Sequence, residues 1–166
     1  EKIPRKFFSR IVDSRLFMVA QSLAETQVRV SGVPFHDIHG NISNGGRFLE
    51  QTILSVINQG YPDLEYIVID GGSTDDSVEI IKKYEKHISY WRSEKDHGVY
   101  DALNFGFQLA TGDLMGWLNS DDVYHEHTLA LVCKLFSVSP TIQWVTGATS
   151  WIDKQNHVVK IKTSRD

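Results

Sequence analysis

The sequence predicts an α/β domain with a mostly parallel central sheet and helices on both of its faces. From residue 47 onward, short apolar runs alternate with helical patterns of about a dozen residues, which is the signature of a parallel sheet with crossover helices. The runs are continuously apolar, as expected for strands covered on both faces. With 166 residues, 41% hydrophobic and 23% charged, the chain can bury the core of one domain.

The amino-terminal part divides at about residue 27. Residues 1–27 place apolar side chains at roughly helical spacing, with basic residues between them, which predicts an N-terminal helical segment. Residues 28–166 then form the main domain. It opens with a short strand at 28–33, followed by Pro34 and an irregular loop rich in Gly, Asn and His.

The first well-marked helix spans residues 47–59 and ends at Gly60 and Pro62, which stop helices. Its apolar face is formed by Leu49, Ile53, Val56 and Ile57. A buried strand follows at 66–69, and Gly71 and Gly72 make the turn after it. Asp76 and Glu79 have the spacing of a capping box and predict the start of the next helix.

The remaining elements continue the alternation. A strand is expected at 88–91, a helix at 99–110, a strand at 114–118 and a helix at 125–137, which must end before Pro140. Another strand begins at 142–145. Two extended segments on either side of residues 153–156 close the sequence as a C-terminal strand pair.

Acidic clusters follow two of the predicted strands, at residues 70–76 and at Asp121 and Asp122. In parallel sheets, ligands bind outside the carboxyl ends of the strands. Asp70 can accept hydrogen bonds from a base or a ribose there, while Gly71 and Gly72 let the backbone approach a ligand. Clusters of Asp, Gly and Ser are also common in turns and helix caps, so both interpretations stay open.

Asp121 and Asp122 are adjacent carboxylates, which repel each other unless a cation or hydrogen-bond donors stabilise them. Their hard oxygen ligands suit Mg²⁺ or Mn²⁺, which commonly bridge carboxylates to a diphosphate. The alternative is a helix N-terminus, where negative charge is favourable. Further polar residues, among them Asp101 and Asn104, lie around the predicted loop and helix after residue 93.

Composition excludes several classes of function. The formal charge of −4 argues against a nucleic-acid partner, which requires a basic face. The sequence contains no His-Glu-x-x-His motif of a zinc site, and no apolar stretch is long enough to span a bilayer. Cys133 is the only cysteine and lies in an apolar run, which predicts a buried thiol and a reducing, cytoplasmic location.

Taken together, these stretches resemble glycosyltransferase family 2, whose members are inverting enzymes with the Rossmann-like GT-A fold. The resemblance runs over about two thirds of the chain, from Arg47 to Val159. It rests on five segments in the family's order, which are RFLEQTILSVINQ at 47–59, IDGGSTD at 69–75, DALNFG at 101–106, ATGD at 110–113 and WLNSDD at 117–122.

The resemblance implies a function and a site. A nucleotide-diphospho-sugar would be the donor, and a saccharide or a lipid-linked molecule would supply the acceptor hydroxyl. The product would be a cell-surface polysaccharide. The enzyme would be cytoplasmic, with possible peripheral contact to the inner face of the membrane. The implied nucleotide-sugar-binding residues are Asp70, Gly71, Gly72, Asp75, Asp101 and Asn104. Asp121 matches the last Asp of the family's metal-binding Asp-x-Asp, Asp122 is the neighbouring acid, and Mg²⁺ or Mn²⁺ would hold the diphosphate.

Three departures from the family pattern favour an alternative, a catalytically incomplete module that keeps the fold and binds nucleotide-sugar or a partner. Asn119 replaces the first Asp of Asp-x-Asp. The opening strand is only approximated by residues 30–35. In the family, the general base lies further along the chain than the position of Asp166, so no residue of this sequence is assigned as the catalytic base.

Other α/β families match less well. A sugar nucleotidylyltransferase needs a Gly-rich basic phosphate loop, for which residues 43–47 are a poor match, and a receiver domain needs a late lysine at a strand end. A dinucleotide-binding dehydrogenase needs a Gly-x-Gly-x-x-Gly turn after a strand, which the sequence lacks.

Overall fold

A computed structural model describes residues 6–9, 30–35, 46–139, 141–147, 149–153 and 158–162. The strands of the described part are β1 (Lys6–Ser9), β2 (Val30–Phe35), β3 (Leu64–Asp70), β4 (Tyr90–Ser93), β5 (Leu114–Asn119), β6 (Trp144–Thr146), β7 (Thr149–Ile152) and β8 (Val158–Lys162). The helices are α2 (Gly46–Ile57), α3 (Ser77–Lys83), the short 3-10 helix η2 (Glu85–His87), α4 (Val99–Leu109) and α5 (Thr128–Val138).

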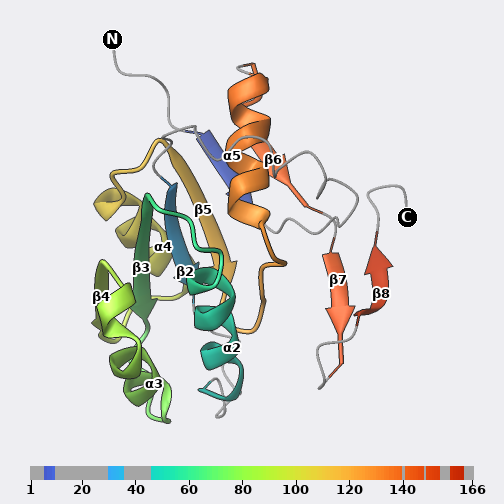
Figure 1. The fold of residues 1–166 in the computed structure, drawn as a ribbon. Coiled ribbons are helices and arrows are strands. Elements are labelled where there is room, and N and C mark those ends of the chain that lie inside the picture. The colour runs from blue at the N-terminus through green and yellow to red at the C-terminus, as the bar shows by residue number, and fades with distance from the viewer. Residues whose placement is uncertain are drawn as a thin grey trace.

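Among the described residues, six strands form one sheet in the order β4-β3-β2-β5-β1-β6, and every neighbouring pair is parallel. The predicted parallel sheet is therefore confirmed. Strand β2 lies between β3 and β5, so the carboxyl ends of these three strands meet at one edge of the sheet (Figure 1). That edge is where an α/β sheet places its ligands.

Helices cover both faces of the sheet, and the alternation of side chains along β3 shows how. Tyr66 and Val68 point into one apolar cluster, whereas Ile67 and Ile69 point into another. The first cluster packs α2, α3 and α5 against the sheet, and the second packs α4 against the opposite face, behind the sheet in Figure 1. All four of these β3 side chains are at most 3% exposed, which explains the continuously apolar run in the sequence.

The helix expected at the amino terminus is wrong at residues 6–9, which form strand β1. This strand pairs in parallel with β5 on one side and with β6 on the other. The apolar pair Phe7 and Phe8 fits a buried strand as well as one turn of a helix, and pairing with distant strands overrides the local pattern. The rest of the predicted segment, residues 1–5 and 10–27, lies outside the described residues.

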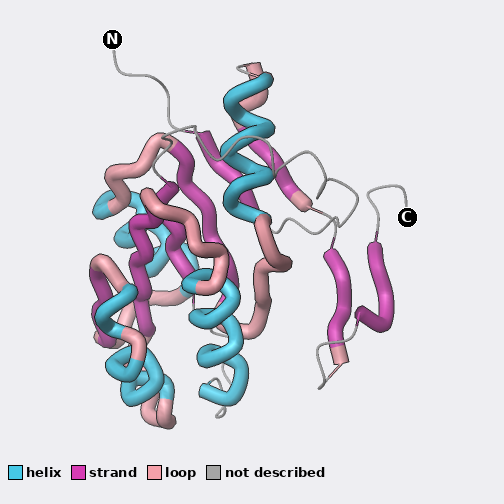
Figure 2. The backbone as a smooth tube through the Cα atoms, in the orientation of Figure 1, coloured by secondary structure: helices cyan, strands magenta, loops and turns pink. Residues whose placement is uncertain are grey.

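Strands β7 and β8 form the predicted C-terminal strand pair. They are antiparallel, with Thr149 opposite Lys162 and an irregularity in the register next to Trp151. The pair stands beside the parallel sheet as a separate ribbon (Figure 2). A hydrogen bond of 3.3 Å between the His125 imidazole and the Ser150 hydroxyl links it to the segment before α5. The residues of the predicted turn, 154–157, are not described.

Other boundaries move by two or three residues. Strand β4 begins at Tyr90 instead of residue 88, because Ile88 still belongs to the end of η2, where its N–H donates to the Glu85 carbonyl. Helix α5 begins at Thr128, after His127 takes a left-handed backbone conformation with φ 62°. Within the described residues, no helix is long and apolar enough to cross a membrane.

Candidate functional site

The strand register brings the two acidic clusters to the same edge of the sheet. Phe35, the last residue of β2, pairs with Ile69 of β3 and with Asn119 of β5. Asp70 directly follows the first partner, and Asp121 lies two residues beyond the second. Because neighbouring strands are about 4.8 Å apart, the two segments emerge from the sheet roughly 10 Å from each other. The predicted convergence of these segments is confirmed at the level of the backbone.

Asp70 is buried, with 1% of its surface exposed, and its carboxylate accepts hydrogen bonds from nearby backbone N–H groups and serine hydroxyls. One oxygen accepts hydrogen bonds from the N–H groups of Gly72 and Ser73, at 3.2 and 2.9 Å, and from the Ser93 hydroxyl at 2.6 Å. The other accepts from the Ser73 hydroxyl at 2.5 Å. The carboxylate therefore organises the turn after β3 and ties it to β4. Its contact with a nucleotide stays a prediction.

Asp75 connects the amino ends of two helices. One oxygen accepts a hydrogen bond from the Ser77 N–H at 3.0 Å, at the start of α3, and the other accepts from the Gly46 N–H at 3.2 Å, at the start of α2. The capping box expected from Asp76 is not formed, since its side chain makes no capping hydrogen bond. Asp75 takes that role because the preceding turn directs its carboxylate at both sets of free N–H groups.

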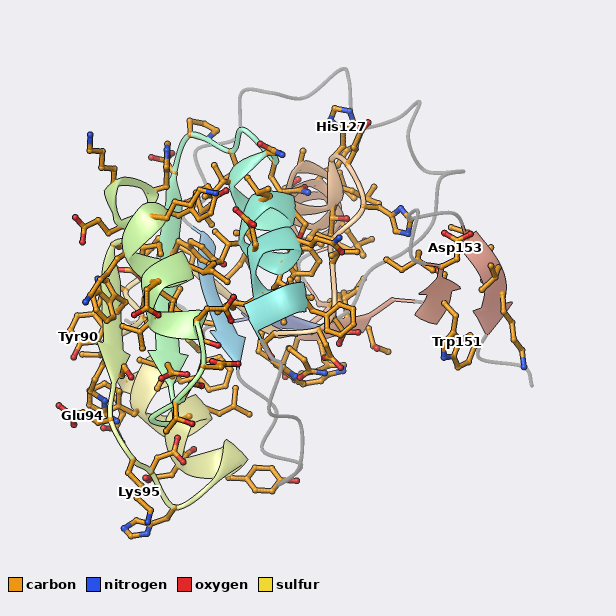
Figure 3. The ribbon with its side chains drawn as sticks, turned by 90° about the horizontal axis from the view of Figure 1, so that it is seen from below. Tyr90, Glu94, Lys95, His127, Trp151 and Asp153 are labelled. Atoms are coloured by element: carbon orange, nitrogen blue, oxygen red, sulfur yellow. The ribbon has the colours of Figure 1, made fainter. Side chains whose placement is uncertain are left out.

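Gly71 and Gly72 lie against the loop that follows β4. A Cβ atom on Gly72 would lie 3.0 Å from the backbone nitrogen of Lys95, and Gly72 has a φ of +86°. A Cβ atom on Gly71 would lie 3.1 Å from the Asp96 carboxylate. A side chain at Gly72 would therefore be strained by its backbone conformation and by a backbone neighbour, whereas one at Gly71 would crowd only the Asp96 carboxylate. The loop carries Glu94 and Lys95 at one end of the molecule (Figure 3).

Asp96 and Arg92 add charges of both signs to this region. Asp96 accepts a hydrogen bond from the Gly98 N–H at 2.9 Å, and its other oxygen is buried without a partner among the described residues. The guanidinium of Arg92 lies over the Phe105 ring, 3.7 Å from its centroid, and 3.6 Å from the Glu94 carboxylate. Asp96 belongs to the polar stretch after residue 93 to which the sequence points, whereas Arg92 was missed. The signal available for Arg92 was its position in β4, shortly before this loop.

Asp101 and Asn104 both lie on α4, whose first residue follows this loop. Asp101 is exposed in the first turn and accepts a hydrogen bond of 3.4 Å from the His97 N–H. Asn104 is exposed less than one turn further along. The helix begins at the predicted edge of the sheet, but these contacts are local. The role of Asp101 and Asn104 in binding a donor stays a prediction.

The segment after β5 is a tight turn. The Asn119 side-chain amide donates to the Asp122 carboxylate at 2.8 Å, and the Asp122 N–H donates to the Asn119 carbonyl at 3.1 Å. Asp121 lies between them and is exposed. By donating to Asp122, Asn119 offsets part of the repulsion between the adjacent carboxylates.

The donor set at this turn fits only one kind of divalent metal site. Among the described residues, no three His, Cys, Asp or Glu side chains form a group that could hold a metal ion. Mg²⁺ and Mn²⁺ need no such group, since they are often held by one or two carboxylates with water and substrate phosphates as the other ligands. Asp121 meets that requirement, and Asp122 is the adjacent acid. Their assignment to a metal stays a prediction.

Polar residues of α2, together with Gln59 just after this helix, hold the turn after β5 in place and were missed in the sequence. The Thr52 hydroxyl lies 2.7 Å from the Ser120 carbonyl and 2.8 Å from the Asp122 carbonyl. Ser55 accepts from the Tyr124 N–H, and Gln59 donates to the His125 carbonyl while accepting from the Leu129 N–H. The signal was the spacing of positions 52, 55 and 59, which share one side of a helix.

Comparisons with known proteins agree with this architecture. The sequence profile described as Glycosyl transferase family 2 matches residues 42–161. An uncharacterized glycosyltransferase of Mycobacterium tuberculosis is 43% identical over 96 residues, which are 57% of this chain and 34% of that protein. One of Haemophilus influenzae is 30% identical over 135 residues, 80% of this chain and 54% of that protein. The matched part of the chain thus spans between a third and about half of these two relatives.

Solved structures share the fold. The mannosyltransferase PcManGT from Pyrobaculum calidifontis, in complex with GDP-Man and Mn²⁺, matches with a TM-score of 0.59 and 24% identity, over 79% of this chain and 37% of that chain. S. aureus TarS 1-349 in complex with UDP matches with a TM-score of 0.54 and 20% identity, over 66% of this chain and 32% of that chain. The structural match is to glycosyltransferases of the GT-A type.

The family profile covers well over half of the chain and includes all the acidic residues placed at the sheet edge. The protein belongs to glycosyltransferase family 2.

Proposed function

We propose that this chain carries the donor-binding part of an inverting glycosyltransferase, which moves a sugar from a nucleotide-diphospho-sugar to an acceptor hydroxyl. The observation that carries the proposal is the register of β2, which brings the turns after β3 and β5 to either side of its carboxyl end, at the same edge of the sheet. A nucleoside diphosphate needs two such anchors, one for the base and ribose and one for the diphosphate.

The turn after β3 would receive the nucleoside. Gly71 and Gly72 would shape this pocket by letting the turn pack closely against the loop after β4, and Asp70 holds the same turn through its hydrogen bonds. Asp75 would define the far side of the pocket, while Asp101 and Asn104 would line it from α4. Two of the similar structures contain UDP and GDP-Man, which supports this class of ligand.

The turn after β5 would receive the diphosphate. Asp121 is exposed there and would hold Mg²⁺ or Mn²⁺ together with phosphate oxygens, with Asp122 as the neighbouring acid. A divalent cation in this place neutralises the charge that develops on the leaving diphosphate. The presence of Mn²⁺ with GDP-Man in the similar mannosyltransferase supports a metal in this role.

The acceptor and the cellular setting belong to the same proposal. We infer a saccharide or lipid-linked acceptor, synthesis of cell-surface polysaccharide, and a reaction on the cytoplasmic side with peripheral contact to a membrane. Inversion requires a general base that removes the proton of the attacking hydroxyl. No residue is assigned to that role, and the curated relatives extend well beyond the matched region.

Titration calorimetry with UDP and GDP, each with and without Mn²⁺, tests the donor site. At least one nucleotide should bind more tightly with Mn²⁺, and Asp121→Ala should abolish that gain while leaving the metal-free affinity unchanged. Asp63→Ala is the matched control, because Asp63 is an exposed acid just before β3, at the opposite edge of the sheet. Its nucleotide binding should equal that of the wild type.

Three outcomes separate the proposal from its alternatives. If wild type and Asp121→Ala show the same dependence on Mn²⁺, the metal assignment is wrong. Metal-dependent binding without hydrolysis or transfer of a sugar from UDP- or GDP-sugars would favour the catalytically incomplete module. Absence of binding by either nucleotide would remove the donor-site proposal altogether.

A further inference from the structure

The side chain of Thr52 is fully buried on the second turn of α2, where it faces the turn after β5. Its hydroxyl lies 2.7 Å from the Ser120 carbonyl oxygen and 2.8 Å from the Asp122 carbonyl oxygen. These two carbonyl groups belong to the residues immediately before and after Asp121. A single buried hydroxyl therefore contacts both neighbours of the acid that the metal proposal depends on.

These two hydrogen bonds are shorter than the one that the Thr52 hydroxyl makes within its own helix. A helical threonine commonly donates to the carbonyl four residues before it, and the Phe48 carbonyl is indeed within reach at 3.3 Å. The two carbonyls of the turn are much closer, so the hydroxyl hydrogen is shared mainly between them. The hydroxyl thus serves the turn after β5 more than its own helix.

The contacts also determine which way the turn faces. With the Ser120 and Asp122 carbonyls directed inward to Thr52, the side chain of Asp121 between them is left on the exposed side. The hydrogen bonds between Asn119 and Asp122 close the same turn from within. The backbone around Asp121 is thereby fixed at both of its ends.

We propose that Thr52 is a positioning residue for the divalent-cation ligand Asp121. The proposal rests on the proposed function and names the group that sets the geometry of its metal site. Without the hydroxyl, the Ser120 and Asp122 carbonyl oxygens lose the buried donor that they share, so the turn between them opens. A metal ligand has to be held to within about 0.5 Å, so a small opening of the turn weakens metal binding.

The test replaces the hydroxyl with a methyl group in Thr52→Val, which keeps the size and branching of the side chain. UDP and GDP are titrated in EDTA and over a series of Mn²⁺ concentrations, using the nucleotide that shows metal-dependent binding to the wild type. We expect the metal-free nucleotide Kd to stay within about twofold of the wild-type value and the Mn²⁺ concentration for half-saturation to rise about tenfold.

Thr128→Val is the matched control. Thr128 is equally buried, at 3% exposure, and its hydroxyl donates to the His125 carbonyl at 2.7 Å, beyond the turn that holds Asp121. Loss of this hydroxyl should lower stability without changing the Mn²⁺ requirement. A purely structural role of Thr52 would make the two variants alike. Equal Mn²⁺ half-saturation in the two valine variants would therefore overturn the proposal.

A second pair of variants covers the case in which valine prevents folding. Thr52→Ser and Thr52→Ala differ only in the hydroxyl, so serine should retain the wild-type Mn²⁺ requirement and alanine should lose it. The same Mn²⁺ half-saturation in both would refute the role of Thr52 while leaving the donor site intact. If the wild type itself shows no metal-dependent nucleotide binding, the proposed function fails first, and the two failures remain distinguishable.

Discussion

Removing an oxygen atom from the centre of this protein should make it more stable. Tyr66 lies on β3 with none of its surface exposed, in the cluster that packs α2, α3 and α5 against the sheet. Its hydroxyl has no hydrogen-bond partner among the described residues. Burial raises the pKa of this phenol far above its ordinary value of 10.0, with a smaller contribution from Tyr124. The substitution that removes this hydroxyl and keeps the ring is Tyr66→Phe.

The magnitude follows from the cost of burying a polar group. A buried hydroxyl without a partner loses about 1–3 kcal/mol of hydration that nothing in the folded state replaces. Phenylalanine keeps the ring and its packing, and the space vacated by one oxygen costs a fraction of that amount. We therefore expect Tyr66→Phe to raise the free energy of unfolding by about 1 kcal/mol, which corresponds to a rise in Tm of roughly 2–4 °C.

Urea denaturation, followed by tryptophan fluorescence, measures the change. Tyr124→Phe is the matched control, since Tyr124 is also buried but its hydroxyl donates a hydrogen bond of 3.4 Å to the Trp117 carbonyl. This second variant should lose about 0.5–1 kcal/mol. A loss of 1 kcal/mol or more in Tyr66→Phe would refute the reasoning, because it would mean that the Tyr66 hydroxyl has a partner, such as a buried water.

Two further predictions concern backbone strain and pH. Gly72→Ala should lower the free energy of unfolding by more than about 2 kcal/mol, because a positive φ is combined with a Cβ position 3.0 Å from the Lys95 nitrogen. Gly60→Ala, with φ +59° and open space around the Cβ position, should lower it by only about 1 kcal/mol. Equal losses of stability in urea denaturation would contradict the steric part of the argument. Burial raises the pKa of the Cys133 thiol from 9.0 to about 11, so the folded state keeps a proton that the unfolded state releases. The contribution of the thiol to the free energy of unfolding should accordingly be intact below pH 9 and fall by roughly 2–3 kcal/mol as the pH rises to 11. Cys133→Ala should remove that part of the decline. An identical decline in the wild type and the variant would exclude the thiol as its source.

The sheet could be predicted from the sequence because burial leaves a local mark. Ile67 and Ile69 face one side of β3 while Tyr66 and Val68 face the other, and both sides are apolar. The place of β1 could not be predicted in this way. Its partners, Leu114 and Trp144, lie more than a hundred residues away, and no local pattern encodes such a pairing.

The site was predictable to the same extent. Asp70 and Asp121 could be placed at one edge because every strand of a parallel sheet ends on that side. What each carboxylate contacts was not predictable, since the Ser93 hydroxyl reaches Asp70 from another strand. The choice of Asp75 over Asp76 as the cap depends on the path of a turn, which residue types alone do not determine.

Helix α2 has two attachments, and together they limit how its sequence can change. Its first N–H group binds Asp75 beside the predicted nucleoside pocket, and Thr52 in its second turn binds the segment that carries Asp121. An insertion or deletion of one residue between Gly46 and Thr52 would rotate one attachment by about 100° relative to the other, which breaks one of them. We therefore expect this stretch to tolerate exchanges of surface side chains but no change in length.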